Sequence, residues 1–235
     1  MLKTFVIKLV KEGLDPETQD SLLQYLPMES QLRLRDRPKN NSRLQTVCGE
    51  LLARYSVGKF VGNASQEIKL VFGEKGKPHI DNLPEVHFNI SHSGHYVVCA
   101  VAATEVGIDV ERVRKVNLRI AERFFSAPEL NDLMALDEES RKQYFITLWT
   151  IKESYLKAIG RGLTQHLNSF TIVRDGSNYK LTGNEEAENF GIKTQQLDAE
   201  YSMAVCAPLP LPECETHFIS LEEILQVFSK TSFPN

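Results

Sequence analysis

The sequence has no CxxC pair, no long apolar run and no excess of positive charge. Its four cysteines (Cys48, Cys99, Cys206 and Cys214) are predicted to be reduced thiols, two of them inside apolar, strand-like runs. The longest apolar stretch, residues 96–103, is far shorter than the ~20 residues that cross a membrane. The formal net charge of -4 argues against a basic surface that would bind nucleic acid.

The N-terminal segment has one short apolar run and lacks the anatomy of a signal peptide. We therefore expect a cytoplasmic protein that binds neither a membrane nor a nucleic acid. We also expect a monomer. The 235 residues are 42% hydrophobic and 25% charged, a composition that suits one large globular domain or two small ones.

The spacing of apolar residues predicts a mixture of helices and strands. The expected helices cover residues 15–26, 44–60, 118–125, 143–159 and 219–228. The expected strands cover residues 5–10, 68–72, 88–90, 96–102, 106–110, 170–173, 179–181 and 201–207. Residues 91–94 are expected to form a polar turn.

Two apolar strand-like segments, 95–100 and 201–207, resemble one another, and each follows a helix that ends in glycine. This resemblance predicts an α+β fold of two similar, pseudosymmetric halves, with the active site in the cleft between them. We expect residues 1–104 to form the N-terminal half and residues 105–235 the C-terminal half with its tail. Chance similarity between two apolar strands is the alternative.

Two carboxylates lie two residues apart in the segment 107–111, GIDVE. On a strand, Asp109 and Glu111 share one face, which we expect to face solvent, while Ile108 and Val110 occupy the buried face. Like charges this close repel unless a cation lies between them, and oxygen ligands favour a hard ion such as Mg²⁺. A solvated strand face also explains this pair when it is taken alone.

The segment 149–157, WTIKESYLK, places Trp149, Glu153 and Lys157 four residues apart, on one face of a predicted helix. Glutamate could complete a metal shell, and lysine could neutralise phosphate charge. The simpler alternative is a surface Glu–Lys pair. Two further segments, 88–94 (FNISHSG) and 73–78 (GEKGKP), could each contact an anion or could be ordinary turns.

In order and spacing, these segments resemble the 4′-phosphopantetheinyl transferases of the surfactin-synthetase-activating type. The resemblance extends from about residue 44 to residue 207 and includes 123–126 (RFFS) with Glu129, and 160–163 (GRGL). It implies transfer of the 4′-phosphopantetheine group from coenzyme A to a serine of an acyl, peptidyl or aryl carrier protein, with release of 3′,5′-ADP. Relatives of this type serve nonribosomal peptide, polyketide and antibiotic biosynthesis.

The resemblance also implies a role for several residues on the reacting side. Asp109, Glu111 and Glu153 would bind Mg²⁺ or Mn²⁺ beside the pyrophosphate of coenzyme A, and Lys157 would pair with that pyrophosphate. Glu153, or a water on the cation, would accept the proton of the carrier serine. Glu129 lies where the family has a further acid near the metal.

On the nucleotide side, the resemblance implies that Ser91 and His92 contact coenzyme A phosphates, His92 most directly the 3′-phosphate. Lys77 and Pro78 would border the adenine, and Thr46 would contribute from the helix at 44–60.

One departure from the family pattern affects the 3′-phosphate. The relatives place two lysines ahead of the helix at 44–60, where this chain has Ser30 and Arg33. Arg33 could replace one lysine but Ser30 cannot replace the other. Four nearby cations could compensate: Arg35, Arg37, Lys39 and Arg43.

Two rival functions use part of the same pattern. A metal-dependent phosphodiesterase would need the same acids and a water as nucleophile. A coenzyme A-binding protein without activity would not need all three acids.

Overall fold

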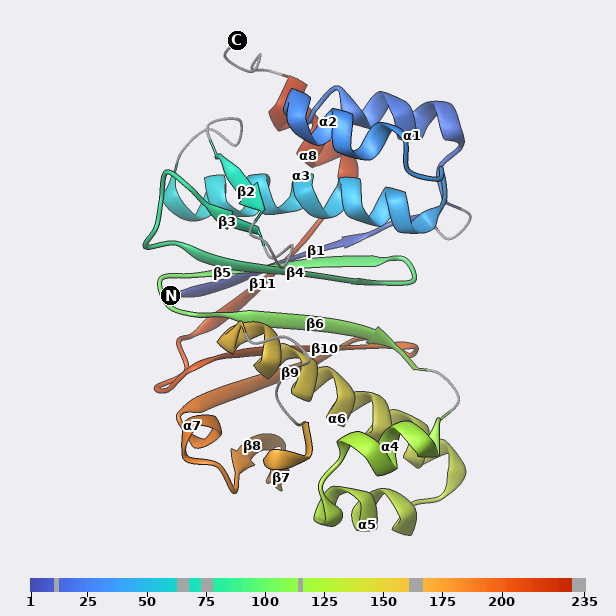
Figure 1. The fold of residues 1–235 in the computed structure, drawn as a ribbon, viewed down its shortest axis with the longest axis vertical. Helices are drawn as coiled ribbons and strands as arrows, with labels where there is room; N and C mark the ends of the chain where they lie inside the picture. The colour runs from blue at the N-terminus through green and yellow to red at the C-terminus, as the bar shows by residue number, and fades with distance from the viewer. Residues whose placement is uncertain (11–12, 63–67, 73–77, 114–115, 161–166, 230–235) are drawn as a thin grey trace. The chain divides into compact units, whose positions relative to one another are not determined.

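A computed structural model describes residues 1–10, 13–62, 68–72, 78–113, 116–160 and 167–229 (Figure 1). The chain forms two compact units. Unit 1 comprises Met1–Ala103 and Glu215–Asn235, and unit 2 comprises Thr104–Cys214. Each unit is described separately below.

Unit 1 is built on a four-stranded sheet with the order β11-β1-β5-β4. Its strands are β1 (Leu2–Lys8), β4 (His87–Ser93), β5 (Tyr96–Ala102) and β11 (Cys214–Ile219). The central strand β5 is buried along its whole length and pairs antiparallel with both β1 and β4. Such a strand reads as a continuous apolar run because neither of its faces meets water.

The helix α3 (Asn41–Val61) covers one face of this sheet, as Figure 1 shows. It begins at Asn40, whose side chain accepts a hydrogen bond from the backbone N–H of Arg43. It ends at Gly62, whose φ of 79° suits a residue without a Cβ. Leu44, Val47, Cys48, Leu51 and Leu52 are buried in the core, which confirms the predicted apolar stripe.

Smaller elements complete unit 1. They are α1 (Pro16–Leu23), α2 (Met28–Arg35), α8 (Leu221–Ser229) and the hairpin of β2 (Leu70–Phe72) with β3 (Pro78–Ile80). Leu22 and Leu34 pack into the same core as α3, which anchors α1 and α2 to the long helix.

Unit 2 contains a five-stranded sheet with the order β6-β10-β9-β8-β7, so β6 is an edge strand. The strands are β6 (Gly107–Arg112), β7 (Thr171–Asp175), β8 (Asn178–Thr182), β9 (Phe190–Asp198) and β10 (Tyr201–Pro208). The helix α6 (Glu138–Ile159) packs on β6, β10 and β9 and ends at Gly160, with a φ of 69°. Leu148, Ile151 and Tyr155 are fully buried, as their helical spacing predicts.

Short helices complete unit 2. They are α4 (Leu118–Phe124), α5 (Ala127–Ala135), α7 (Glu185–Glu188) and a 3₁₀ turn, Leu167–Ser169. The ring of Trp149 lies 5.7 Å from that of Phe124 of α4 and 6.5 Å from that of Phe145, one turn earlier on α6. The tryptophan is therefore part of the packing of α6 in this unit.

The assignment of residues 105–235 to one half was wrong at the C-terminal end. The strand β11 lies beside β1 in unit 1, where the Thr4 hydroxyl donates to the Thr216 hydroxyl at 2.9 Å. The helix α8 buries Ile224 and Phe228 in the core of unit 1. A pairing between the two ends of a chain leaves no local signal in the sequence, which is why periodicity could not reveal it.

The predicted α+β class is confirmed. Each unit has one long helix on one face of an antiparallel sheet, and each helix ends at a left-handed glycine. The pseudosymmetry of the halves and a cleft between them stay predictions. Within the described ranges, no helix is long and apolar enough to cross a membrane.

Candidate functional site

The edge strand β6 presents its two acids toward α6. Asp109 lies opposite Ala204 of β10, which belongs to the core beneath α6, and Glu111 lies opposite Ser202. Asp109 is only 4% exposed, whereas Glu111 is half-buried. The expectation of a solvent-facing strand surface was therefore wrong for Asp109, because a helix covers that face.

The approach of α6 to β6 is close enough to require a glycine. A Cβ on Gly107 would lie 1.9 Å from the carbonyl oxygen of Ser154 and 2.4 Å from the backbone nitrogen of Ala158. Glu153 and Lys157 immediately precede these two residues on α6. The missing side chain of Gly107 thus lets the helix bring its charged residues toward the acids of the strand.

Asp109 and Lys157 form an ion pair across this contact. The Lys157 Nζ donates to Asp109 Oδ1 at 2.5 Å. The side chain of Lys157 remains 28% exposed while that of Asp109 is 5% exposed. The pair is therefore buried at the carboxylate and open at the ammonium, a geometry that leaves lysine able to meet an incoming anion.

Glu153 lies among charges of its own sign. Burial raises its pKa above the usual value, and the neighbouring Asp109 and Glu111 raise it further, while Lys157 lowers it. The structure therefore brings together Asp109, Glu111, Glu153 and Lys157, all within unit 2, from elements more than forty residues apart. A buried carboxylate whose pKa is raised by neighbouring acids is typical of a functional site.

The donor set suits a hard divalent cation, because it consists of carboxylate oxygens. Among the residues that the structure describes, however, no three acidic, histidine or cysteine side chains are already spaced to hold a metal ion. Lys157 takes one oxygen of Asp109 instead. A cation that used this oxygen of Asp109 would have to replace the ammonium of Lys157 there, whereas Oδ2 is not engaged by that lysine.

Glu129 does not belong to this cluster, so the expectation of a further acid beside the metal is wrong. Its carboxylate is fully buried and forms an ion pair of 3.0 Å with Lys152. It also accepts hydrogen bonds from the backbone N–H groups of Ser126, at 2.7 Å, and Ile172, at 2.6 Å. Both of its oxygens are thus used to connect α5, α6 and β7.

On unit 1, Ser91 and His92 lie within β4 and not in a turn, which corrects the sequence-based expectation. Because they are adjacent on a strand, their side chains point to opposite faces of the sheet. His92 is exposed and shares its face with Ile90, which contacts α3, whereas Ser91 is buried on the other face. The two side chains therefore cannot present a single surface to one phosphate group.

Thr46 follows Gln45, the residue of α3 that contacts the turn between β4 and β5. The Gln45 side chain donates to the carbonyl of Gly94 at 2.6 Å, which anchors the β4–β5 turn to the helix. The Thr46 hydroxyl donates to the carbonyl of Ser42 at 2.8 Å and is half-buried. Pro78 begins β3 and is half-buried, and Lys77 lies outside the described residues.

Arg33 belongs to a buried network around Glu50 of α3. Its guanidinium pairs with Glu50 at 2.7 Å, and the hydroxyl of Ser30 donates to the same carboxylate at 2.5 Å. Arg54 pairs with Glu50 at 3.3 Å. Ser30 is only 4% exposed, so the serine that replaces the family's lysine is a buried hydrogen-bond donor and not an open anion contact.

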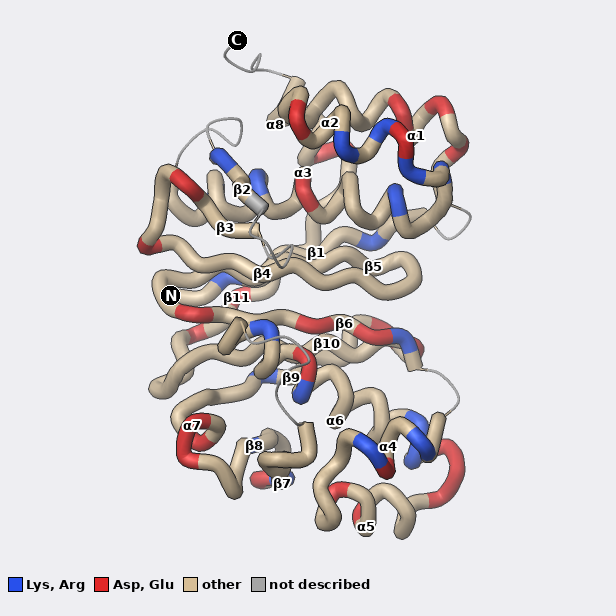
Figure 2. The backbone as a smooth tube through the Cα atoms, in the orientation of Figure 1, with Lys and Arg blue, Asp and Glu red and all other residues tan. Residues whose placement is uncertain are grey.

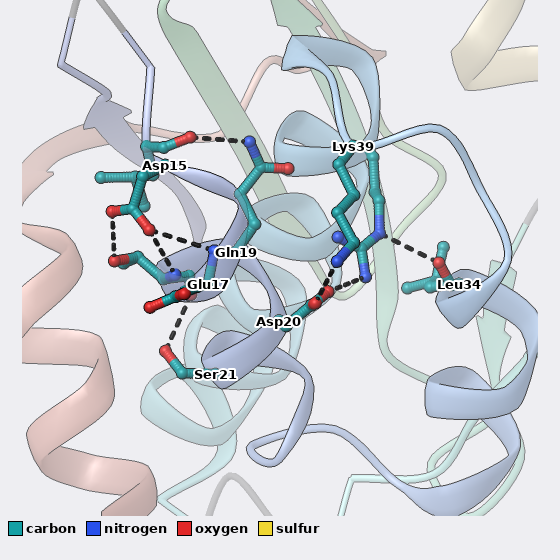
Figure 3. Close-up of polar contacts among 10 residues, drawn as sticks. Asp15, Glu17, Gln19, Asp20, Ser21, Leu34 and Lys39 are labelled. Carbon is teal, nitrogen blue, oxygen red and sulfur yellow. Dashed lines mark hydrogen bonds and ion pairs between the residues drawn. The ribbon is translucent and has the colours of Figure 1, made fainter.

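The other cations ahead of α3 differ in how they are used. Lys39 and Arg43 both pair with Asp20, at 2.5 and 2.7 Å, and Figure 3 shows the Lys39 contact. Arg43 is 2% exposed and also donates to the carbonyl of Leu34. Basic positions follow one another along α2 and toward α3 in Figure 2. Among them, Arg35 and Arg37 are exposed and form no ion pair within the described part of the chain.

Sequence reasoning missed the residues that hold the site in place. Gly107 stood in a recognised segment, but its contact with α6 depends on a tertiary approach that no spacing reveals. Gln45 and the pair of Glu129 with Lys152 were missed for the same reason. The sequence offered one signal for them: a glycine, an amide and a pair of opposite charges occur in elements that also contribute apolar residues to a core.

Comparison with known proteins gives consistent matches along the chain. Residues 105–206 match the 4′-phosphopantetheinyl transferase superfamily, and residues 15–104 match a family described as 4′-phosphopantetheinyl transferase, N-terminal. The 4′-phosphopantetheinyl transferase Sfp of Bacillus subtilis is 35% identical over 90% of this chain and 95% of its own. The transferase psf-1 of Bacillus pumilus is 37% identical over 77% of this chain and 78% of its own.

A solved structure, the holo-[acyl-carrier-protein] synthase of Thermotoga maritima, matches 48% of this chain and 64% of its own at 20% identity. Its TM-score of 0.38 is too low to compare the two folds.

Proposed function

The chain belongs to the 4′-phosphopantetheinyl transferase superfamily, and we propose that Asp109, Glu111 and Glu153 bind the divalent cation of its reaction. The enzyme transfers the 4′-phosphopantetheine group of coenzyme A to a serine of a carrier protein and releases 3′,5′-ADP. A Mg²⁺ ion, once bound, would offset the charge of the pyrophosphate as the bond to phosphorus breaks.

The residues of β6 and α6 would then act on the reacting groups. Lys157 would exchange Asp109 for an oxygen of the pyrophosphate, because its ammonium is the exposed member of the pair. Glu153 would accept the proton of the carrier serine. Burial and the nearby acids raise the pKa of Glu153, which suits a carboxylate that must take up a proton.

Unit 1 would bind the nucleotide end of coenzyme A. His92 is exposed at the end of β4, and Arg35 and Arg37 are exposed ahead of α3, so we propose these three residues for the 3′-phosphate. Arg33 would also contribute, because its side chain is 32% exposed although it pairs with Glu50. Thr46 and Pro78 stay proposed contacts of the nucleotide, and so do Lys77 and Ser91.

One observation carries the proposal: four charged groups from β6 and α6, three of them acids, meet at one place in unit 2. The test is incubation of the protein with coenzyme A and a panel of purified apo carrier domains, acyl and peptidyl, followed by intact mass measurement. We expect the carrier to gain one phosphopantetheine in Mg²⁺ and none after chelation.

Two results would contradict this account. Full transfer in the presence of excess chelator would remove the cation from the reaction. Release of free phosphopantetheine without a gain in carrier mass would indicate hydrolysis by a phosphodiesterase. The panel also shows which class of carrier the enzyme accepts, and we propose carriers of peptide and polyketide assembly. We also propose a cytoplasmic monomer.

A further inference from the structure

At Gly107 the backbone of β6 lies directly against the backbone of α6. The atoms that a Cβ would meet there are backbone atoms: Ser154 O at 1.9 Å, Ala158 N at 2.4 Å and Ala158 Cα at 3.0 Å. No side chain can rotate away to make room, because none is involved. A substitution at Gly107 therefore has to move either the helix or the strand.

Two other glycines in the described part of the chain, Gly49 and Gly191, have less demanding neighbours. A Cβ on Gly49, where α3 meets its sheet, would lie 3.3 Å from a side-chain carbon of Ile90. A Cβ on Gly191 of β9 would lie 2.8 Å from side-chain carbons of Leu209 and Leu211. Only side chains have to yield at these two positions. Gly107 also has no left-handed φ, so it is required for space and not for backbone conformation.

The displaced part of α6 would be the part that carries the charges. Ser154 directly follows Glu153, and Ala158 directly follows Lys157. A contact at 1.9 Å must lengthen by about 1.5 Å to reach an ordinary separation of 3.4 Å. The ion pair of Lys157 with Asp109 spans 2.5 Å and depends on this approach.

We propose that Gly107 is a positioning residue of the transferase: it sets the separation between the acids of β6 and the charged residues of α6. This proposal rests on the proposed function, since it gives a catalytic reason for the close packing. A displacement of about 1 Å at a reacting group can cost about 10²-fold in rate. The effect would be transmitted through helix position, without contact between Gly107 and substrate.

Gly107→Ala is the direct test, with two readouts beyond activity. The crystal structure of the variant should show α6 displaced and Lys157 separated from Asp109. The dissociation constant of Mn²⁺, measured by electron paramagnetic resonance with saturating coenzyme A, should rise at least about tenfold. The kcat should fall about 10²-fold, while the KM for the carrier stays near its original value.

Two matched substitutions separate positioning from simple destabilisation. Gly191→Ala overpacks the same unit, and Gly49→Ala overpacks the contact between α3 and the sheet of unit 1. Both should leave the dissociation constant of Mn²⁺ unchanged, because a dissociation constant reports on folded molecules only. If Gly107→Ala does not accumulate as folded protein, Ala158→Val adds volume at a buried position of α6 whose backbone adjoins Gly107, and it should give the same pattern in milder form.

The proposal is overturned if the folded variant keeps the Lys157–Asp109 contact and normal kcat. A wild-type protein that binds no Mn²⁺ in the presence of coenzyme A would overturn the cation site instead. In that event, the position of α6 in the crystal structure, together with kcat, still decides the role of Gly107.

Discussion

The two long helices, α3 and α6, each lie on one face of an antiparallel sheet, yet they use buried charge in opposite ways. In α3, the carboxylate of Glu50 accepts hydrogen bonds from Ser30, Arg33 and Arg54. In α6, Glu153 lies near two other acids, and its pKa is raised by burial and by those neighbours. The first acid is neutralised by the protein itself, and the second is not.

This difference separates structural charge from functional charge. A buried carboxylate that receives cations and hydroxyl groups needs nothing further, and it contributes to the fold. Acids that repel one another destabilise the fold and are tolerated where a ligand supplies the missing positive charge. Unit 2 contains both kinds of buried acid. Glu129 of α5 is of the structural kind, because Lys152 of α6 and two backbone N–H groups neutralise and satisfy its carboxylate.

Asp109→Asn should break the functional cluster with the largest effect on activity. The substitution keeps the shape of a side chain that is only 4% exposed, but it removes the charge that faces α6. We expect kcat/KM for carrier modification to fall by about 10²–10³-fold. The free energy of unfolding should change by less than about 1 kcal/mol, since Lys157 can reach solvent. Unchanged transfer by this variant would sink the assignment of Asp109 to the chemistry.

Glu129→Gln should break the structural pair with the largest effect on stability. Glu129 and Lys152 both have side chains with no exposed surface, so the remaining ammonium would be buried without its acid. The expected loss is about 3–5 kcal/mol in the free energy of unfolding, measured by urea denaturation. The double variant Glu129→Gln, Lys152→Met should recover much of that loss. A double variant as unstable as the single one would contradict the pairing.

The cations of unit 1 also differ in how they are used, because some are exposed and others are already paired with acids. His92→Ala, Arg35→Ala and Arg37→Ala should each weaken coenzyme A more than 3′-dephospho-coenzyme A. The expected differences are about 0.5–1 kcal/mol, because exposed contacts are screened by water and salt. Lys39→Ala is the matched control, since Lys39 already pairs with Asp20. Equal weakening of both ligands would show that a residue does not contact the 3′-phosphate.

Asp20 gives the smallest effect and a pH dependence. Hydrogen bonds from Lys39 and Arg43 lower the pKa of Asp20 below its ordinary value of 3.8. The ionised form therefore stabilises the fold above that pH, and the contribution disappears as the pH falls through the lowered pKa. Asp20→Asn should flatten the part of the stability curve that lies below the ordinary pKa of 3.8. If Asp20→Asn loses stability at low pH just as the wild type does, other carboxylates dominate that loss, such as the helix-capping Asp15 in Figure 3.

Local pattern predicted the parts of the fold that depend on neighbours in the sequence. The apolar stripes of α3 and α6, the strand β6 and the glycine ends of both long helices follow from spacing alone. The strand β11 could not be predicted, because its partner β1 lies at the other end of the chain. The extension of β4 through Ser91 and His92 was also missed, since polar residues at a strand end resemble a turn.

The residues of the candidate site also divide into those that the sequence predicted and those that depend on tertiary packing. The acids Asp109, Glu111 and Glu153 were predicted from residue type and spacing, and the structure brings them together. Neither the buried pair of Glu129 with Lys152 nor the burial of Ser30 against Glu50 was predicted, because both depend on helices that pack from elsewhere in the chain.

Direct measurement of Mn²⁺ binding, with saturating coenzyme A, tests the contrast between the two kinds of acid. Wild-type protein should bind one ion, and Asp109→Asn, Glu111→Gln and Glu153→Gln should each weaken binding at least about tenfold. Glu50→Gln, which removes a neutralised acid, should keep the wild-type dissociation constant in its folded fraction. The account would be contradicted if the three acid variants bound Mn²⁺ as tightly as the wild type, or if Glu50→Gln weakened binding as much as they did.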